Sequence, residues 1–488
     1  MPSKPKGIIA AGHSETAKAG YEMLQAGGNA FDAVLSAMLV SFIAEASLTS
    51  MGGGGFLNTW TAEGESVLFD FFVQTPKIRK PVEEMDVKES YIHFGATSQK
   101  QYSGKGTVAV PGCAAGLFHV HKRLGRLPMK EIMAPAIELA RKGVLITPYQ
   151  EYSLDILRDM MLEKPEVAAI YGPNGHTLRT GETMYMPAFA DLLELLEREG
   201  VRAFYEGEVG QAFAADNEAN GGSVSMEDLR AYRVKERMPL SVDYHGYKLY
   251  TNPLPSAGGT LICHGLHHLA ARPSADSPFG MEHAGRLIET FQAMEAYRKA
   301  EMHPPLNDPL GNTTHISVID AEGNAASLTS TVGGATGELI PNTGIQTNNM
   351  LGETDLFPDG LYTWPTNVRV SSMMSPSILA QNDKPKLVIG SGGSSRIRTA
   401  IIQVLVNMLD HKMPIQDAVN HPRLHYENGL LSLEPGLLAA EELDQVQRFN
   451  PVLWDAANMY FGGTHAAVLR SDGSFAGAAD ARRSGVVL

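Results

Sequence analysis

The first fifty residues combine a short apolar run with two stretches of helical pattern. Residues 7–11 are apolar, and so short a run predicts a strand. Ser14 can begin a helix that continues to about residue 25, where Gly27 and Gly28 stop it. Residues 30–44 are apolar on nearly every side, a pattern typical of a helix buried between two layers.

Helices and strands are mixed along the rest of the chain. A 3.6-residue periodicity predicts further helices at residues 131–142, 188–198 and 394–410. A strand at residues 386–389 precedes the last of these helices. Because no repeat, low-complexity segment or linker-like stretch interrupts this pattern, we expect no boundary between independent domains.

A hairpin is predicted in the middle of the chain. One alternating run ends at Ile319, five turn-forming residues follow, and a second run begins at Ala325. If Ile319 pairs with Ala325, the same register places Thr313 opposite Thr331, with both hydroxyls on one face of the sheet. Pairs of threonines across strands are ordinary in sheets, so the pattern alone leaves a structural and a catalytic interpretation open.

Composition and charge narrow the class of protein. Of the 488 residues, 43% are hydrophobic and 19% are charged, which indicates a globular protein. The net charge of −14 disfavours sequence-independent binding to nucleic acid or to an anionic membrane. The only cysteines, Cys113 and Cys263, exclude a disulfide framework and a four-thiolate zinc site. Because we find neither a signal peptide nor an apolar stretch long enough to span a bilayer, we expect a cytoplasmic protein.

Three further segments contain residues suited to binding or catalysis. Residues 51–56 (MGGGGF) fit a close-packed turn better than a phosphate loop, because no Gly-Lys-Ser/Thr follows. Residues 390–395 (GSGGSS) join a strand to a helix, where free N–H groups suit an oxyanion, and a dinucleotide loop is the rival interpretation. His264 and His268 have the spacing of a helical metal pair, but Gly265 and the lack of an adjacent Glu favour an ordinary helix face.

Eight short motifs follow one another along most of the chain. They are residues 22–33 (EMLQAGGNAFDA), 52–56 (GGGGF), 110–112 (VPG), 253–259 (PLPSAGG), 312–317 (NTTHIS), 348–349 (NN), 371–376 (SSMMSP) and 390–394 (GSGGS). In this order they resemble the gamma-glutamyltranspeptidases, members of the N-terminal-nucleophile hydrolase superfamily, from about residue 7 to 485. The resemblance implies an α+β fold, a four-layer αββα sandwich with two mostly antiparallel sheets.

The resemblance also implies how the chain becomes active. The precursor would cut itself between Asn312 and Thr313, and Thr313 would then be the nucleophile. A threonine hydroxyl needs a base, and the new α-amine, with a pKa of about 7.7–8.0, suits that role near neutral pH. Thr331 would hydrogen-bond the Thr313 hydroxyl, and N–H groups near Gly393 and Ser394 would form the oxyanion hole.

Segments 1–312 and 313–488 would then be two subunits of one intertwined fold rather than independent domains. Among the substrate contacts that the resemblance implies, this sequence keeps Ser372, Asn349 and Glu353. The carboxylate of Glu353 would bind the amine of the substrate.

Other substrate positions depart from the family pattern. Phe72 stands where the family has an Arg that clamps the α-carboxylate of the γ-glutamyl group, and Phe cannot replace a bidentate guanidinium. Gly333 stands where the family has an Asn, and Met373 where it has a second serine. Arg369 or Arg396 is therefore a candidate substitute for the missing positive charge.

We expect a self-processing gamma-glutamyltransferase or glutathione hydrolase-like enzyme. It would pass an acyl group from a small amide, through a threonyl ester, to water or an amine. No metal or organic cofactor is implied. Two alternatives stay open: a related amidohydrolase or acylase with a non-glutamyl acyl donor, and an uncleaved pseudoenzyme that binds a metabolite.

Overall fold

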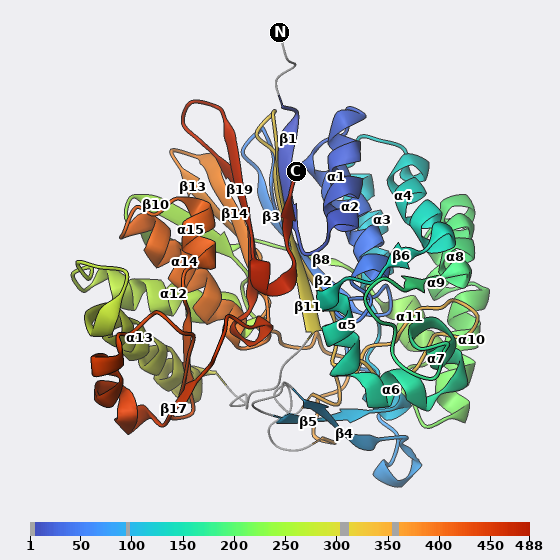
Figure 1. The fold of residues 1–488 in the computed structure, drawn as a ribbon. Helices are drawn as coiled ribbons and strands as arrows, with labels where there is room; N and C mark the ends of the chain where they lie inside the picture. The colour runs from blue at the N-terminus through green and yellow to red at the C-terminus, as the bar shows by residue number, and fades with distance from the viewer. Residues whose placement is uncertain (1–4, 94–97, 303–311, 354–360) are drawn as a thin grey trace.

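The computed structural model describes residues 5–93, 98–302, 312–353 and 361–488. Two large sheets lie at its centre and helices cover their outer faces (Figure 1). One group of helices, α1–α4, lies on one side of the sheets, and α12–α15 lie on the other. The predicted αββα arrangement of four layers is confirmed.

The first sheet has seven strands, and all of their pairings are antiparallel. In spatial order these are β20 (Val486–Val487), β1 (Gly7–Ala11), β11 (Asn312–Asp320), β12 (Ala325–Gly333), β2 (Gly54–Trp60), β3 (Ser66–Phe71) and β8 (Lys235–Arg237). Strands from both sides of the bond between residues 312 and 313 are therefore hydrogen-bonded to one another within one sheet. Neither part of the chain could complete this sheet without the other.

The second sheet has six strands and is also antiparallel. Its spatial order is β19 (Phe475–Ala479), β18 (Gly463–Leu469), β14 (Lys384–Gly392), β13 (Ser377–Gln381), β10 (Tyr247–Thr251) and β9 (Leu240–Tyr244). The two sheets meet through hydrogen bonds as well as apolar contacts. The Ser317 hydroxyl donates to the carbonyl of His465 (3.0 Å), and the Ser327 hydroxyl donates to that of Ile389 (3.1 Å).

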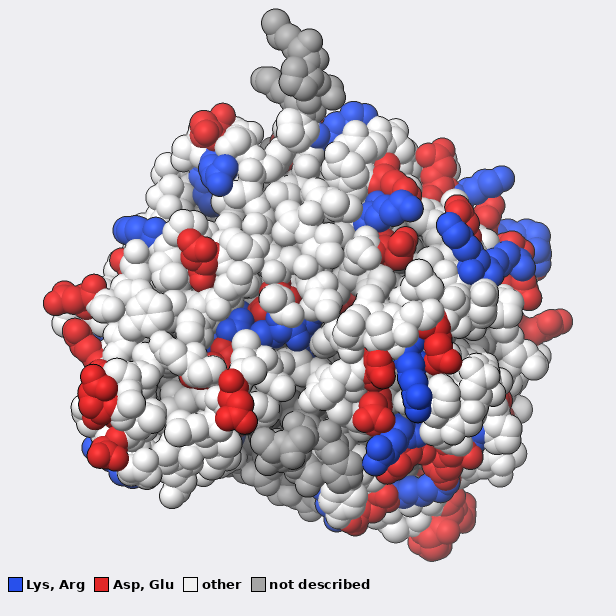
Figure 2. All heavy atoms as spheres, in the orientation of Figure 1, with Lys and Arg blue, Asp and Glu red and all other residues white. Residues whose placement is uncertain are grey.

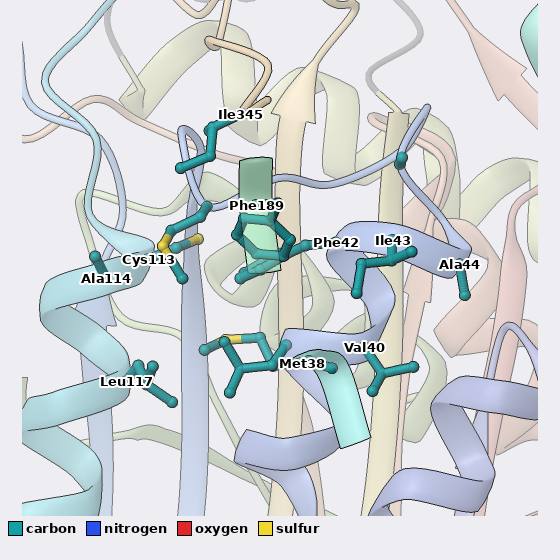
Figure 3. Packing of buried hydrophobic residues seen from close by; sticks show 14 of the residues in the cluster. Met38, Val40, Phe42, Ile43, Ala44, Cys113, Ala114, Leu117, Phe189 and Ile345 are labelled. Carbon is teal, nitrogen blue, oxygen red and sulfur yellow. The ribbon is translucent and has the colours of Figure 1, made fainter. Parts of the chain in front are cut away.

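The helix predicted from the all-round apolar pattern is confirmed as α2 (Ala30–Ala44), and every residue in it is buried. Its start is fixed by a capping box, in which Asn29 accepts from the N–H of Asp32 and the Asp32 carboxylate accepts from that of Asn29. Figure 3 shows α2 side chains meeting residues of α3 (Cys113–Leu124) and α8 (Pro187–Glu199). Phe42 packs edge-on against Phe189, with ring centroids 6.4 Å apart.

The remaining α-helices are spread along the whole described chain. They are α1 (Ser14–Gln25), α4 (Met129–Lys142), α5 (Pro148–Asp155), α6 (Arg158–Glu163), α7 (Pro165–Tyr171), α9 (Arg202–Tyr205), α10 (Glu208–Ala219), α11 (Met226–Ala231), α12 (Ala257–Ala270), α13 (Gly280–Glu301), α14 (Arg396–Leu409) and α15 (Ile415–Asn420). Small sheets are formed by β4 (Lys88–His93) with β5 (Ser98–Ser103), β6 (Val144–Leu145) with β7 (Thr183–Met184), and β15 (Leu424–Glu427) with β16 (Leu430–Leu433) and β17 (Pro451–Leu453).

Figure 2 shows charged side chains of both signs around the rim of this face, and a small group of Lys or Arg side chains beside acidic atoms in a hollow near its centre. Among the helices of the described residues, none is both long and apolar enough to cross a bilayer.

Candidate active site

The predicted hairpin is confirmed in its register. Ile319 pairs with Ala325, and Thr313 pairs with Thr331, at the end of the hairpin far from the turn. The register shifts between Asn312 and Thr313, because Asn312 pairs with Gly333 and one residue of β12 is skipped. Such a bulge re-aims side chains and is over-represented beside active sites. Here it falls on the peptide bond at which the family resemblance places cleavage.

The Thr331 hydroxyl is held in one orientation. It accepts a hydrogen bond from the N–H of Gly333 (2.9 Å) and donates to the carbonyl oxygen of Asn312. The next carbonyl, that of Thr313, accepts from Nη1 of the buried Arg483 (2.8 Å). Both carbonyls that flank the Thr313 nitrogen are therefore bound by donors. Arg483 was not among the residues predicted from the sequence.

The second sheet brings a glycine loop up to this point. Gly392 ends β14 so close to the hairpin that a Cβ there would lie 2.2 Å from the Thr313 carbonyl oxygen. Gly393 and Ser394 follow with φ of 120° and 52°, and helix α14 begins only at Arg396. The helix was predicted to begin at residue 394, and these left-handed conformations are the reason that it starts later. The strand predicted at residues 386–389 is longer in the structure. Its pairing with β18 continues to Gly392.

The backbone N–H groups of Gly393 and Ser394 donate no hydrogen bond to any acceptor among the described residues. They precede a 14-residue helix, whose N-terminus carries partial positive charge. Free donors at such a position can stabilise a developing oxyanion. A dinucleotide-binding role finds no support here, because Gly392 lies against the Thr313 carbonyl and the loop lacks the full glycine spacing of the dinucleotide fingerprint.

The two threonines and Ser394 of the glycine loop line one cavity of ≈ 40 Å³. The lining residues are Phe72, Arg298, Thr313, Thr331, Met350, Glu353, Ser371, Ser372, Met373, Met374, Ser394, Ser395 and Ile397. The cavity thus brings together most of the residues that the sequence predicted for the site.

Glu353 lies in this cavity as a buried acid. Burial raises its pKa to about 7, opposed by a hydrogen bond from the Gly334 backbone. Its Oε1 has no hydrogen-bond partner among the described residues, so it is available to a ligand. Gly333 makes room for it: φ there is +79°, and a Cβ would lie 2.7 Å from Oε1 of Glu353 and 2.2 Å from Oδ1 of Asn349.

Asn349 has a supporting place rather than a position on the cavity wall. Its Oδ1 accepts from the N–H of Gly334 (2.7 Å), and its Nδ2 donates to Gln101 (3.1 Å) and to the carbonyl of Tyr102 (3.2 Å). It therefore holds the strand that follows Thr331 instead of facing the cavity. Ser372 does line the cavity, and its hydroxyl accepts from the N–H of Met374 (3.0 Å).

Phe72 is buried on the cavity wall and stacks on Phe56, with centroids 5.3 Å apart. The two arginines suggested as substitutes for the missing family Arg are engaged elsewhere. Arg369 is bound to Asp70 (3.2 Å) and to the carbonyl of Phe72, and the Arg396 guanidinium lies over the Tyr460 ring at 4.9 Å. Neither of them lines the cavity in the part of the chain that the structure describes. Arg298, which the sequence analysis missed, does.

The other segments singled out in the sequence have structural roles. Gly53 lets the backbones approach, since a Cβ there would lie 2.1 Å from the Thr331 carbonyl oxygen, which supports the close-packed turn. On α12, His264 stacks on Tyr297 at 4.4 Å and His268 pairs with the Thr290 hydroxyl at 3.1 Å. No group of three or more His, Cys, Asp or Glu residues within the described ranges is arranged to hold a metal.

Comparison with known proteins agrees with this geometry. A model of the gamma-glutamyltranspeptidase family matches residues 16–309 and 306–488. The "Acylase ACY 1 proenzyme" of Pseudomonas sp. (strain SE83) is 30% identical over 99% of this chain and 93% of its own length. The "Glutathione hydrolase proenzyme" of Escherichia coli (strain K12) is 28% identical over 98% of this chain and 90% of its own length.

Solved structures share the fold. The crystal structure of a cephalosporin acylase from Bacillus halodurans superimposes on this chain with a TM-score of 0.86 and 23% identity. The match covers 100% of this chain and 97% of the acylase chain. Helicobacter pylori gamma-glutamyltranspeptidase covers 62% of this chain and 86% of its own, with a TM-score of 0.54 and 26% identity. The predicted N-terminal-nucleophile hydrolase fold is confirmed, and the chain belongs to the gamma-glutamyltranspeptidase family of enzymes.

Proposed function

We propose that the chain cleaves itself between Asn312 and Thr313 and then uses Thr313 as the nucleophile of an amide hydrolase or acyltransferase. The observation that carries this proposal is the position of Thr313. It pairs with Thr331 beside the bulge, on the wall of a cavity that Glu353 and Ser394 of the glycine loop also line. The names of both relatives include the word proenzyme, which fits a self-processing chain.

Self-cleavage would begin with attack of the Thr313 hydroxyl on the carbonyl carbon of Asn312. The hydroxyl proton passes to the Thr313 nitrogen as the C–N bond breaks, which leaves an ester between Asn312 and Thr313. Water then hydrolyses the ester to an Asn312 carboxylate and a free Thr313 amine. The hydrogen bond from Thr331 to the Asn312 carbonyl supports this path, since it would stabilise the negative charge that develops on that oxygen.

In the mature enzyme the Thr313 amine would serve as general base for the hydroxyl beside it. Attack on a substrate amide gives a threonyl ester and releases an amine, and a second acceptor, either water or an amine, removes the acyl group. Thr331, Gly393 and Ser394 would orient the nucleophile and stabilise the oxyanion. The segments 1–312 and 313–488 would stay together, because strands of both are hydrogen-bonded to each other in the first sheet.

Substrates of two kinds are supported to different degrees. Glu353 in the cavity favours a γ-glutamyl amide, because its carboxylate can bind the substrate ammonium group. Phe72 and Met373, where the family has an Arg and a Ser, favour a different acyl group, as in an acylase. Turnover of a γ-glutamyl anilide against glutaryl and simple acyl anilides separates the two.

The mass of the denatured, purified protein tests the cleavage step. Splitting 52.6 kDa in proportion to 312 and 176 residues predicts species of about 34 and about 19 kDa, the smaller beginning at Thr313. A single 52.6 kDa species after prolonged incubation would contradict the proposal and favour an uncleaved binding protein instead.

A pH dependence follows from Glu353. Burial raises its pKa to about 7, so the group is protonated below that pH and ionised above it. We expect the KM for a γ-glutamyl anilide to fall as the pH rises from 6 to 8, because only the ionised carboxylate pairs with the ammonium group. In Glu353→Gln the KM should be higher and should no longer fall over this range. A fall of the same size in this variant would show that another group controls binding.

A further inference from the structure

One cation lies in the wall of the active-site cavity at a position that the family motifs do not include. Arg298 lies near the C-terminal end of α13, 15 positions before Thr313, and its side chain is 2% exposed. It lines the same cavity as Thr313, Glu353 and Phe72. Among the described residues that line this cavity, it is the one Arg or Lys.

The described residues pair the guanidinium of Arg298 only in part. Its Nη1 donates to Oε1 of Glu427 (2.9 Å), and this is the one hydrogen bond that the group makes within the part of the chain that the structure describes. Its Nε is buried and has no acceptor among the residues that the structure describes. A guanidinium carries five N–H donors, and buried donors without partners are costly. An acceptor that enters the cavity would therefore gain by binding here.

The protein partner of Arg298 is itself shared. The same Oε1 of Glu427 accepts from Nη2 of Arg398 (2.5 Å), and Nε2 of His425 lies 3.4 Å from the other oxygen. Burial lowers the pKa of His425 to about 4, so this imidazole is neutral at neutral pH. Two guanidinium groups thus share one carboxylate oxygen beside the cavity, and Arg298 is the one that reaches the wall.

We propose that Arg298 binds a carboxylate on the acyl group of the substrate, replacing the clamp that Phe72 cannot supply. This inference rests on the proposed function. The substrates would be amides whose acyl group ends in a carboxylate, such as glutaryl amides. An arginine whose side chain is 2% exposed is well suited to bidentate carboxylate binding. The same cavity also has an apolar wall, formed by Phe72, Met350 and Ile397. This wall suits the methylene groups between the carboxylate and the scissile amide.

The test compares two anilides that differ only in charge at the end of the acyl chain. Glutaryl-4-nitroanilide carries the carboxylate, and the corresponding terminal amide is its neutral isostere. Arg298→Gln removes the cation from the cavity wall, and Arg298→Lys keeps the charge. Arg398→Gln is the matched control, because it removes a buried guanidinium from the same Glu427 oxygen without removing a lining residue. Mass spectrometry first establishes that each variant is processed like the wild type.

We expect the wild type to prefer the charged anilide by at least about 30-fold in kcat/KM, and most of this preference to lie in KM. Arg298→Gln should lose the preference while keeping turnover of the neutral anilide. Arg298→Lys should recover part of it, and Arg398→Gln should retain it. The proposal is overturned if Arg298→Gln keeps the preference, or if Arg298→Gln and Arg398→Gln lose it alike.

Binding of free glutarate, measured by calorimetry, separates this proposal from the proposed function. If the wild type turns over neither anilide but binds glutarate, and Arg298→Gln does not, the catalytic proposal fails and the carboxylate site stands. If the wild type turns over the neutral anilide, shows no preference for charge and does not bind glutarate, catalysis stands and the carboxylate site is wrong. A preference confined to anilides with a carboxylate on the leaving group would also overturn it.

Discussion

Thr313→Ala should remain a single chain of 52.6 kDa and should turn over no amide substrate. The substitution removes the hydroxyl that would attack the Asn312 carbonyl, so no ester forms and no α-amine is released. Loss of the nucleophile costs roughly a million-fold in kcat in other hydrolases, and here it also prevents the general base from appearing. Intact mass and anilide turnover measure the two effects separately.

Thr313→Ser keeps a hydroxyl at the same position and should still be processed. Its processing would show that Thr313→Ala fails because the hydroxyl is missing and not because the variant is misfolded. Thr314→Ala is the matched control, because Thr314 is the next residue of β11 and its hydroxyl binds Glu45 on the opposite face of the sheet. We expect this control to be cleaved between residues 312 and 313. A Thr313→Ala protein that still divides into two species at this bond, or that hydrolyses anilides, would show that the nucleophile lies elsewhere.

The hairpin could be predicted because its information is local. The alternation of the run that ends at Ile319 and the length of the turn that follows it set the register of the two strands. Thr313 and Thr331 follow from that register. The motif order then identified the family. Helix α2 was equally accessible, since a segment apolar all round has only one environment in which it is stable.

The residues that sequence reasoning missed lie outside the motifs, and only the fold brings them to the site. Arg483 reaches the Thr313 carbonyl from 170 residues away, and Arg298 reaches the cavity from a helix that gives no signal of its own. Arg369 was suggested as a cavity cation, but its bond to Asp70, nearly 300 residues earlier, holds it elsewhere. The delayed start of α14 has a local cause, the left-handed conformation of Ser394, which is uncommon for a residue other than glycine.

The second large effect is expected at Thr331. In the uncut chain its hydroxyl accepts from the Gly333 N–H and donates to the Asn312 carbonyl, so it is aimed at the oxygen that becomes negatively charged during cleavage. Thr331→Val keeps the shape of the side chain and removes the donor. We expect self-cleavage to slow by about 100- to 1,000-fold, as the loss of one oxyanion donor does in other hydrolases. Conversion of freshly purified precursor, followed by mass, gives the rate.

Thr331→Ser restores the donor and should be processed within about tenfold of the wild type, since only a methyl group is lost. Thr329→Val provides the control for burial, because Thr329 lies on the same strand and its hydroxyl pairs with His315 at 2.8 Å, away from the scissile bond. If Thr329→Val and Thr331→Val were slowed alike, the effect would come from packing of the hairpin. If Thr331→Val matured at the wild-type rate, its hydroxyl would have no part in cleavage. The bulge at Asn312 would then be the feature that activates the bond, since it is the remaining irregularity that the described strands show there.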